Sequence, residues 1–207
     1  DAEVLRQCAK QSGKASDFQL VDQENLGSVS SPTVLDIRLM DLEQLQPGTI
    51  NPATGQAAYG YVNEAIDACL AGLVDAVTTC PANKEAMRSA GVTLPGHTEI
   101  FAERTQTEKF CMAFICEIIS CSLVTVHAGY TDVPSLLTEQ RIAEVIELTR
   151  ETHKKLLGKE PRIAVCGLNP HAGENGLFGH GEEEKIILPA IEMMRGKGCD
   201  LTGPLPP

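Results

Sequence analysis

The features that would indicate a membrane or nucleic-acid partner are missing from this sequence. No apolar run reaches the roughly 18 residues that cross a bilayer, and the N-terminal residues do not follow the pattern of a signal peptide. Basic residues are scarce: 17 Lys and Arg stand against 28 Asp and Glu, which gives a formal net charge of −11. This charge argues against nucleic acid and anionic membranes as partners, and a small anionic substrate would need a local pocket of hydrogen-bond donors.

Several short motifs of known chemistry are also missing. The chain has neither GxGxxG nor GxxxxGK(S/T), so its residues alone support neither a dinucleotide fingerprint nor a P-loop. It also lacks GxSxG, which marks a serine hydrolase elbow, and HExxH, which marks a zinc protease helix. The run Glu182–Glu184 is best interpreted as the start of a helix, where the dipole favours acidic residues, rather than as a pair of catalytic carboxylates.

The eight cysteines include no CxxC pair. Most of them lie within apolar runs of a chain long enough to bury a core. We therefore expect reduced, buried thiols, as in a cytoplasmic protein, and no disulfide framework. Three of them recur every five residues, a spacing that matches strand packing and no known metal-cluster motif. The thiols expected to be buried are Cys69, Cys111, Cys116, Cys121 and Cys166.

Apolar runs with strand character alternate with amphipathic segments through most of the chain. This alternation predicts an α/β fold with a mostly parallel sheet and helices on both faces, a three-layer α/β/α arrangement. Helices are expected at 1–13, 56–72 and 138–157, the last with Thr138 as its N-cap. Strands are expected at Phe18–Val21, Val34–Ile37, Asp75–Cys80, Phe110–Ile115, Ser122–His127 and Arg162–Cys166, and shorter helices after Pro81, toward Thr105, after Asp132 and from Glu182 to Gly198.

The two ends of the sequence have the character of cut ends. The chain begins inside the first expected helix and finishes on a Pro-rich turn at 201–207. Natural domains rarely stop at such points. We therefore expect residues 1–207 to form a partial α/β unit.

The densest group of functional residue types is Gly167-Leu-Asn-Pro-His-Ala-Gly-Glu174, which follows the expected strand Arg162–Cys166. Open α/β sheets place their chemistry where a strand ends and feeds a helix. His171 lies in this stretch and His127 ends the preceding apolar run, so both are candidates to hold one divalent metal at the ends of neighbouring strands. Two imidazoles need a third ligand. The alternative is that each is a hydrogen-bonded structural histidine.

A second candidate group is Gly96-His97-Thr98-Glu99, which opens an expected helix. Free backbone N–H groups and the helix dipole favour an anion there, so His97 and Thr98 are candidates for holding a phosphate or a carboxylate. The alternative is a plain helix start with Thr98 as its N-cap. Lys84 follows another expected strand end; it either adds positive charge to this group or is a solvated surface lysine.

These motifs together resemble the 4-hydroxythreonine-4-phosphate dehydrogenase family. The resemblance covers nearly the whole chain, and the string Gly167–Glu174 is long and specific. The other matching segments occur in the same order as in the family: Asn83-Lys84, Leu94–Glu99, Val126-His127 with Asp132, Pro161–Gly167 and Gly203–Pro206.

The resemblance implies a fold similar to that of the isocitrate and isopropylmalate dehydrogenases, with two α/β/α lobes and an active site in the cleft and at a homodimer interface. The implied reaction is NAD-dependent oxidation, with decarboxylation, of a small phosphorylated hydroxy acid, 4-phosphooxy-threonine, on the route to pyridoxal phosphate. Three histidines bind a divalent metal in the family. Two of them correspond to His127 and His171, and the substrate-binding pair corresponds to His97 and Thr98.

The chemistry of the residues agrees with these implied roles. A divalent metal would lower the pKa of the substrate hydroxyl and stabilise the enolate that decarboxylation forms. Among zinc, cobalt, nickel and magnesium, imidazole ligands suit the first three, and magnesium prefers oxygen. Lys84 is a catalytic candidate that either neutralises the substrate carboxylate or phosphate or moves a proton. Asp132 is a candidate for orienting a metal-ligating histidine.

The sequence also departs from the family. The glycine-rich opening strand does not precede Asp1, and the segment with the third metal histidine is absent from the 207 residues. His180 lengthens the family pattern and has no assigned role. The alternatives are a related dehydrogenase acting on phosphorylated threonate or erythronate or on a cyclic dihydrodiol, a non-catalytic metal- or anion-binding remnant, and a plain structural α/β domain.

Overall fold

The computed structural model describes residues 1–207, which divide into two compact units, 1–107 and 108–207. Helices and short strands follow one another through the chain, so the predicted α/β class is confirmed. The strands form three two-stranded sheets instead of one continuous sheet. Two of these pairs, β1 with β2 and β5 with β6, are parallel as predicted, and β3 with β4 is antiparallel.

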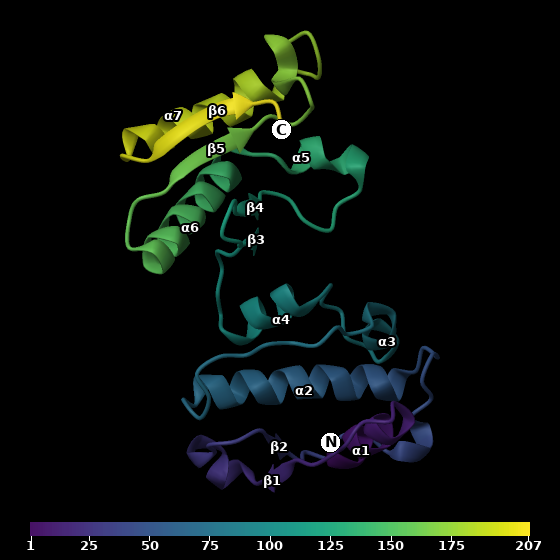
Figure 1. The fold of residues 1–207 in the computed structure, drawn as a ribbon. Coiled ribbons are helices and arrows are strands. Elements are labelled where there is room, and N and C mark those ends of the chain that lie inside the picture. Colours follow the sequence, from purple (N-terminus) through teal and green to yellow (C-terminus); the bar gives the residue numbers. More distant parts are fainter. The chain divides into compact units, whose positions relative to one another are not determined.

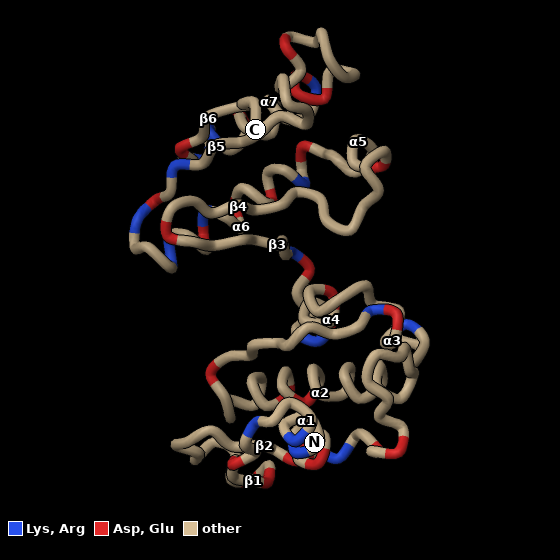
Figure 2. Tube along the Cα trace, turned by 45° about the vertical axis from the view of Figure 1, so that its right-hand side comes forward, with Lys and Arg blue, Asp and Glu red and all other residues tan.

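Helix α2 forms the middle layer of the first unit. In Figures 1 and 2 it lies between the β1–β2 pair on one side and helices α3 and α4 on the other. Side chains from α2, α3 and α4 share a small core made of Val62, Ile66, Met87 and Ile100. The elements of this unit are α1 (Ala2–Gln11), β1 (Gln19–Val21), β2 (Thr33–Leu35), α2 (Pro52–Leu70), α3 (Lys84–Ser89) and α4 (His97–Arg104).

Helix α2 starts earlier than its apolar pattern predicts. Asn51 is its N-cap and accepts a hydrogen bond of 2.8 Å from the N–H of Ala53, while Pro52 occupies the first helical position. The buried Gly55 brings this first turn against α3: a Cβ at this position would lie 2.0 Å from the carbonyl oxygen of Ala86. The turn-forming residues before Gln56 thus belong to the helix: Asn51 and Pro52 begin it, and Gly55 allows α3 to pack closely against it.

The second unit is built on two helices and a parallel strand pair. Helices α6 and α7 pack against each other, and α7 also packs against β6 (Figure 1). The elements are β3 (Met112–Phe114), β4 (Cys121–Leu123), α5 (Val133–Leu136), α6 (Glu139–Leu157), β5 (Arg162–Cys166), α7 (Leu188–Gly196) and β6 (Asp200–Leu205). The core consists of Ile142, Ala143, Ile146, Ile187, Ala190, Ile191, Met194, Cys199 and Leu201.

The helices cover only one face of the β5–β6 pair. Ile163 and Val165 of β5 point to the core, while Ala164 and Cys166 on the other face are exposed. The expectation of buried thiols is therefore wrong for the five cysteines named above: Cys69 and Cys111 are half-buried and the other three are exposed. All eight cysteines are free, and the one buried thiol is Cys199.

The caps of α6 match the sequence. Thr138 accepts a hydrogen bond of 3.1 Å from the N–H of Arg141, as predicted for an N-cap, and the helix ends at Gly158 in the left-handed conformation. Helices α2 and α6 are the longest, with 19 residues each. No helix combines the length and the apolar character needed to cross a bilayer.

Three strand predictions need correction. Residues 75–80 pair with no other segment and form no strand, because a strand requires a neighbour for its backbone hydrogen bonds. Strand β4 ends at Leu123, not at His127, and pairs antiparallel with β3 because the connection between them is too short for a parallel crossover. The Pro-rich C-terminal segment, expected as a turn, contains strand β6.

Candidate functional site

His171 lies in the loop that follows β5 and begins a short 3₁₀ turn, Ala172–Glu174. Its backbone N–H donates to Oδ1 of Asn169 at 3.0 Å, so the asparagine side chain closes the turn. The Nδ1 atom of its ring lies 2.8 Å from Oε1 of Glu174, and the ring stacks on Phe178 with a centroid distance of 4.7 Å. The imidazole is 55% exposed.

The loop folds around the buried carboxylate of Glu183. Its Oε1 accepts a hydrogen bond of 2.9 Å from the N–H of Leu168 and a longer one of 3.4 Å from Nδ2 of Asn169. Its Oε2 is buried without a hydrogen-bond partner. The prediction that Glu182–Glu184 is only an acidic helix start is therefore incomplete, because Glu182 and Glu183 are buried at 8% and 2% exposure.

Glu182 organises the other end of the same loop. One of its carboxylate oxygens accepts a hydrogen bond of 2.7 Å from the backbone N–H of His180. This bond is the main reason that the pKa of Glu182 is lowered. The carbonyl of His180 accepts a hydrogen bond of 2.7 Å from Nζ of Lys185. His180 thus takes part in the loop through its backbone, and its exposed ring has no recorded role.

A second motif lies beside the start of this loop. Strand β6 contains Gly203–Leu205 of the C-terminal Gly-Pro-Leu-Pro segment and runs parallel to β5. The pairing continues past β5, because the N–H of Gly167 donates to the carbonyl of Leu205 at 2.8 Å. Two segments about forty residues apart in the chain therefore meet where the loop begins.

His127 lies in the segment between β4 and α5, four residues beyond the end of β4. It is exposed and has a left-handed backbone, with φ of 55°. Asp132 folds back over this segment, since a Cβ on Gly129 would lie 2.8 Å from its Oδ2. The role of Asp132 in orienting a histidine remains a prediction.

Arg141 connects this segment to helix α6. Its guanidinium donates to the carbonyl of Val124 at 3.1 Å and to the carbonyl of Phe110 at 3.0 Å. It also pairs with Glu144 at 2.5 Å. The backbone just before β3 and the backbone just after β4 are thereby fixed to one side chain of α6, which limits the positions that His127 can take.

The two histidines belong to the same unit, but they do not form a complete metal site there. No three His, Cys, Asp or Glu side chains come together within residues 1–207 as a group that could hold a metal ion. The chemistry of the donors nevertheless suits a metal: the carboxylate of Glu174 accepts a hydrogen bond from Nδ1–H of His171 and leaves Nε2 as the lone-pair donor, the arrangement common to metal-bound histidines. Metal binding by His127 and His171 therefore remains a prediction that needs a further ligand.

In the first unit, the side chain of Lys84 lies beside Gly96, the residue that precedes His97 at the N-terminus of α4. Lys84 is the first residue of α3, where Asn83 is the N-cap and accepts from the N–H of Ala86 at 2.8 Å. The lysine side chain reaches Gly96: a Cβ there would lie 3.5 Å from Lys84 Nζ and equally far from Glu99 Oε2. The Nε2 atom of His97 is buried without a hydrogen-bond partner.

The alternative of a Thr98 helix cap is wrong. Helix α4 begins at His97, and its N-cap is Gly96, which offers no side-chain hydrogen bond. The first N–H groups of α4 are thus not closed by a cap residue, and Thr98 lies inside the first turn with its side chain half-buried. This leaves the helix start suited to an anion, with the Lys84 ammonium and the Glu99 carboxylate beside it.

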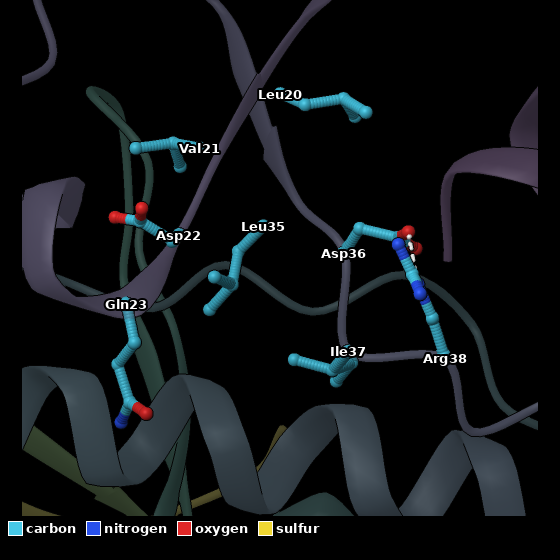
Figure 3. Close-up of a pocket in the computed structure, with 8 residues that line it drawn as sticks. All are labelled: Leu20, Val21, Asp22, Gln23, Leu35, Asp36, Ile37 and Arg38. Carbon is cyan, nitrogen blue, oxygen red and sulfur yellow. Dashed lines mark hydrogen bonds and ion pairs between the residues drawn. The ribbon is translucent and has the colours of Figure 1, made fainter.

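A hollow of the first unit lies elsewhere, at the ends of β1 and β2 (Figure 3). It has a volume of about 420 Å³ and is lined by Leu20–Gln23 and Leu35–Arg38. Asp36 and Arg38 form an ion pair of 3.0 Å there, and a hydrogen bond from the N–H of Ala2 is the main cause of the lowered pKa of Asp36. None of the predicted site residues lines this hollow.

Sequence reasoning missed three side chains that shape the candidate site. Asn169 and Glu174 lie inside the recognised motif, and their contacts with His171 follow from the turn that the glycines allow. Glu183 lies nine residues beyond the motif, and its burial had no sequence signal apart from the adjacent acidic run.

Comparison with known proteins places the whole chain in one family. The family model described as pyridoxal phosphate biosynthetic protein PdxA matches residues 1–207. Among curated proteins, the chain is 40% identical to a 4-hydroxythreonine-4-phosphate dehydrogenase of Desulfosudis oleivorans, over 100% of this chain and 62% of that protein. It is also 40% identical to a D-threonate 4-phosphate dehydrogenase of Pectobacterium atrosepticum, over 84% of this chain and 53% of that protein.

Solved structures give the same result for the fold. A crystal structure of 4-hydroxythreonine-4-phosphate dehydrogenase from Klebsiella pneumoniae superposes with a TM-score of 0.86 at 37% identity. The superposition covers 99% of this chain and 62% of that one. The chain thus spans between about half and three fifths of the length of the relatives that it matches.

Proposed function

Because the chain belongs to the PdxA family, we propose that it serves an oxidoreductase that oxidises the secondary alcohol of a small phosphorylated hydroxy acid. The proposed substrate is 4-phosphooxy-threonine, and the product then loses carbon dioxide on the route to pyridoxal phosphate. NAD is the proposed hydride acceptor. A cytoplasmic homodimer is the proposed form of the protein.

The observation that carries this proposal is the group at the start of α4. Lys84 reaches the helix start, Gly96 leaves it uncapped, and the buried Nε2 of His97 has no hydrogen-bond partner within residues 1–207. An anionic ligand would accept from the free backbone N–H groups and from the ammonium, and it would give the imidazole a partner. The adjacent Glu99 carboxylate places a negative charge beside Lys84, which favours a ligand that brings its own hydrogen-bond donor.

The residues of the second unit have a different proposed task. His127 and His171 would hold a divalent cation, which when bound supplies Lewis-acid activation of the substrate hydroxyl. Glu174 keeps the proton on Nδ1 of His171 and so presents Nε2 outward. Asp132 is proposed to orient His127, since its carboxylate lies over the same short segment. The two-histidine donor set favours zinc, cobalt or nickel over magnesium.

A second substrate has support from the relatives. Some of them are D-threonate 4-phosphate dehydrogenases, at the same level of identity as the 4-hydroxythreonine-4-phosphate dehydrogenases. Both substrates have a phosphate, a secondary hydroxyl and a carboxylate, and they differ in the group beside the carboxylate. The proposed roles of Lys84, His97 and His171 are the same for either substrate.

The test uses the full-length protein, dialysed and then loaded with zinc, cobalt, nickel or magnesium. NADH formation is followed by absorbance with 4-phosphooxy-threonine, with phosphorylated threonate or erythronate, and with a cyclic dihydrodiol. NADH formation with one phosphorylated hydroxy acid supports the proposal and selects the substrate. Bound metal without NADH formation from any of them would instead support a non-catalytic metal-binding role.

A further inference from the structure

We infer that Glu183 is a positioning residue: its buried carboxylate holds the loop 167–176 in the shape that presents His171. This inference rests on the proposed function, because His171 matters only if it binds the metal. The hydrogen bonds of the Glu183 carboxylate come from the backbone of Leu168 and from the side chain of Asn169, and not from the His171 ring or from Glu174, with which that ring pairs. The Asn169 side chain then accepts from the N–H of His171 and closes the loop there.

The hydrogen bonds form a continuous path from Glu183 to His171. The carboxylate accepts from the N–H of Leu168 at 2.9 Å and from Nδ2 of Asn169 at 3.4 Å. The other end of the Asn169 amide, Oδ1, accepts from the N–H of His171 at 3.0 Å and of Gly173 at 3.3 Å. One buried carboxylate thus sets the amide orientation of Asn169, and that amide fixes the backbone on both sides of Ala172.

The loop needs such support because its backbone is strained. Five consecutive residues, 172–176, have φ between 40° and 86°, and three of them are not glycine: Ala172, Glu174 and Asn175. The left-handed region is sterically unfavourable for a residue with a Cβ, and less so for asparagine than for alanine or glutamate. Such a conformation persists only where surrounding contacts determine it. Glu183 is buried, at 2% exposure, and hydrogen bonds are stronger in such surroundings. Its hydrogen bonds therefore help to hold the loop in this conformation.

Steric contact adds to the hydrogen bonds. A Cβ on Gly173 would lie 2.8 Å from Oε2 of Glu183, and one on Gly167 would lie 3.1 Å from Oε1. The loop therefore approaches the carboxylate at two points, Gly167 and Gly173. The neighbouring Glu184 is exposed and makes no contact of this kind, which separates the role of Glu183 from the general acidity of the segment.

The first experiment compares Glu183→Gln with the matched control Glu184→Gln in the full-length protein. Zinc affinity is measured by competition with a chromophoric chelator, and the absorption spectrum of the cobalt-loaded protein reports the ligand geometry. We expect Glu183→Gln to weaken zinc binding about tenfold and to change the cobalt spectrum at saturating metal, with Glu184→Gln unchanged. Glu183→Ala should bind zinc more weakly than Glu183→Gln, because the glutamine amide still supports part of the loop. Equal affinities and identical spectra for Glu183→Gln and Glu184→Gln would overturn the inference.

A second pair of variants keeps the test decisive if Glu183→Gln folds poorly. Gly173 and Gly176 both have a left-handed backbone, with φ of 76° and 86°, but only Gly173 faces the carboxylate, and nothing lies within 4 Å of a Cβ on Gly176. Alanine at either position therefore has a similar backbone cost. Gly173→Ala should lower the zinc affinity well below that of Gly176→Ala, and equal losses would count against Glu183.

His171→Ala separates this inference from the proposed function. If His171→Ala loses zinc while Glu183→Gln behaves like Glu184→Gln, His171 keeps its proposed role and the positioning role is rejected. If His171→Ala binds zinc as tightly as the unchanged protein, the proposed metal role fails and the inference fails with it. Thermal unfolding of each variant identifies any loss that comes from a general loss of structure.

Discussion

The Nδ1 atom of His171 and Oε1 of Glu174 lie 2.8 Å apart, three residues from each other on one short turn. Glu174→Gln replaces the carboxylate with a weaker acceptor and relaxes the preference for the Nδ1–H tautomer. We expect zinc affinity to fall about tenfold, as is usual for the hydrogen-bond partner of a metal-bound histidine. The measurement is zinc competition with a chelator, and Glu151→Gln on the exposed side of α6 is the control. The same affinity for both variants would show that the pair does not serve the metal.

Lys84→Met tests the anion group at the start of α4. The change removes the ammonium but keeps most of the length of the side chain. A charged hydrogen bond contributes about 1.5–3 kcal/mol, so the KM for a phosphorylated substrate should rise by about one to two orders of magnitude. Steady-state kinetics of NADH formation measure it. The control Lys155→Met, at the exposed end of α6, should leave the KM unchanged. An unchanged KM in Lys84→Met would mean that Lys84 is a solvated surface lysine that does not bind the substrate.

Gly55→Ala tests the close packing of α2 against α3. The added Cβ would lie 2.0 Å from the carbonyl of Ala86, so the helices must move apart. We expect the free energy of unfolding to fall by about 1–3 kcal/mol, the usual effect of overpacking. Gly196→Ala is the matched control, since it is also helical and has nothing within 4 Å of its Cβ. Chemical denaturation measures both, and equal stability of the two variants would contradict the packing argument.

Glu160 gives a prediction about pH. Hydrogen bonds from Arg150 and Lys154, in the C-terminal half of α6, lower its pKa from the ordinary value of 4.5 to about 2. Because the folded-state pKa is the lower one, these contacts stabilise the fold above pH 4.5, and the contribution disappears as the pH falls toward 2. Glu160→Gln should therefore be less stable than the unchanged protein at pH 7, and the difference should shrink between pH 4.5 and 2.

Thermal unfolding over this pH range measures the Glu160 effect, and added salt should reduce it because all three side chains are partly or largely exposed. Glu151→Gln serves again as the control. A stability difference that stays constant from pH 7 to pH 2 would mean that the ion pairs are not its source.

Local signals in the sequence were sufficient to predict the positions of elements that have caps and long periodic patterns. Helix α6 has both, with Thr138 and Gly158 at its ends, and it lies where predicted. The specific string Gly167–Glu174 identified the loop after β5 and the family to which the chain belongs. Lys84 and His97 each begin a helix, and Gly96 lets the lysine approach the start of α4, while their roles in binding a ligand stay predictions.

The errors have a common physical origin in partners far along the chain. Whether an apolar run such as Asp75–Cys80 becomes a strand depends on a neighbouring segment that its own residues do not specify. The exposure of Cys166 follows from helices covering one face of β5–β6 only, which the apolar run alone does not reveal. The sequence predicts Glu183 only as part of an acidic helix start, because the burial of a carboxylate depends on the loop that surrounds it.

The left-handed backbone at 172–176 has a consequence for protein engineering. A synthetic peptide with this string would relax to a right-handed or extended shape, since nothing within those residues repays the strain. Grafting the motif onto another scaffold would fail for the same reason unless the host supplied a buried acid at the place of Glu183. The transplantable module is therefore the strand, the loop and the first turn of the following helix together.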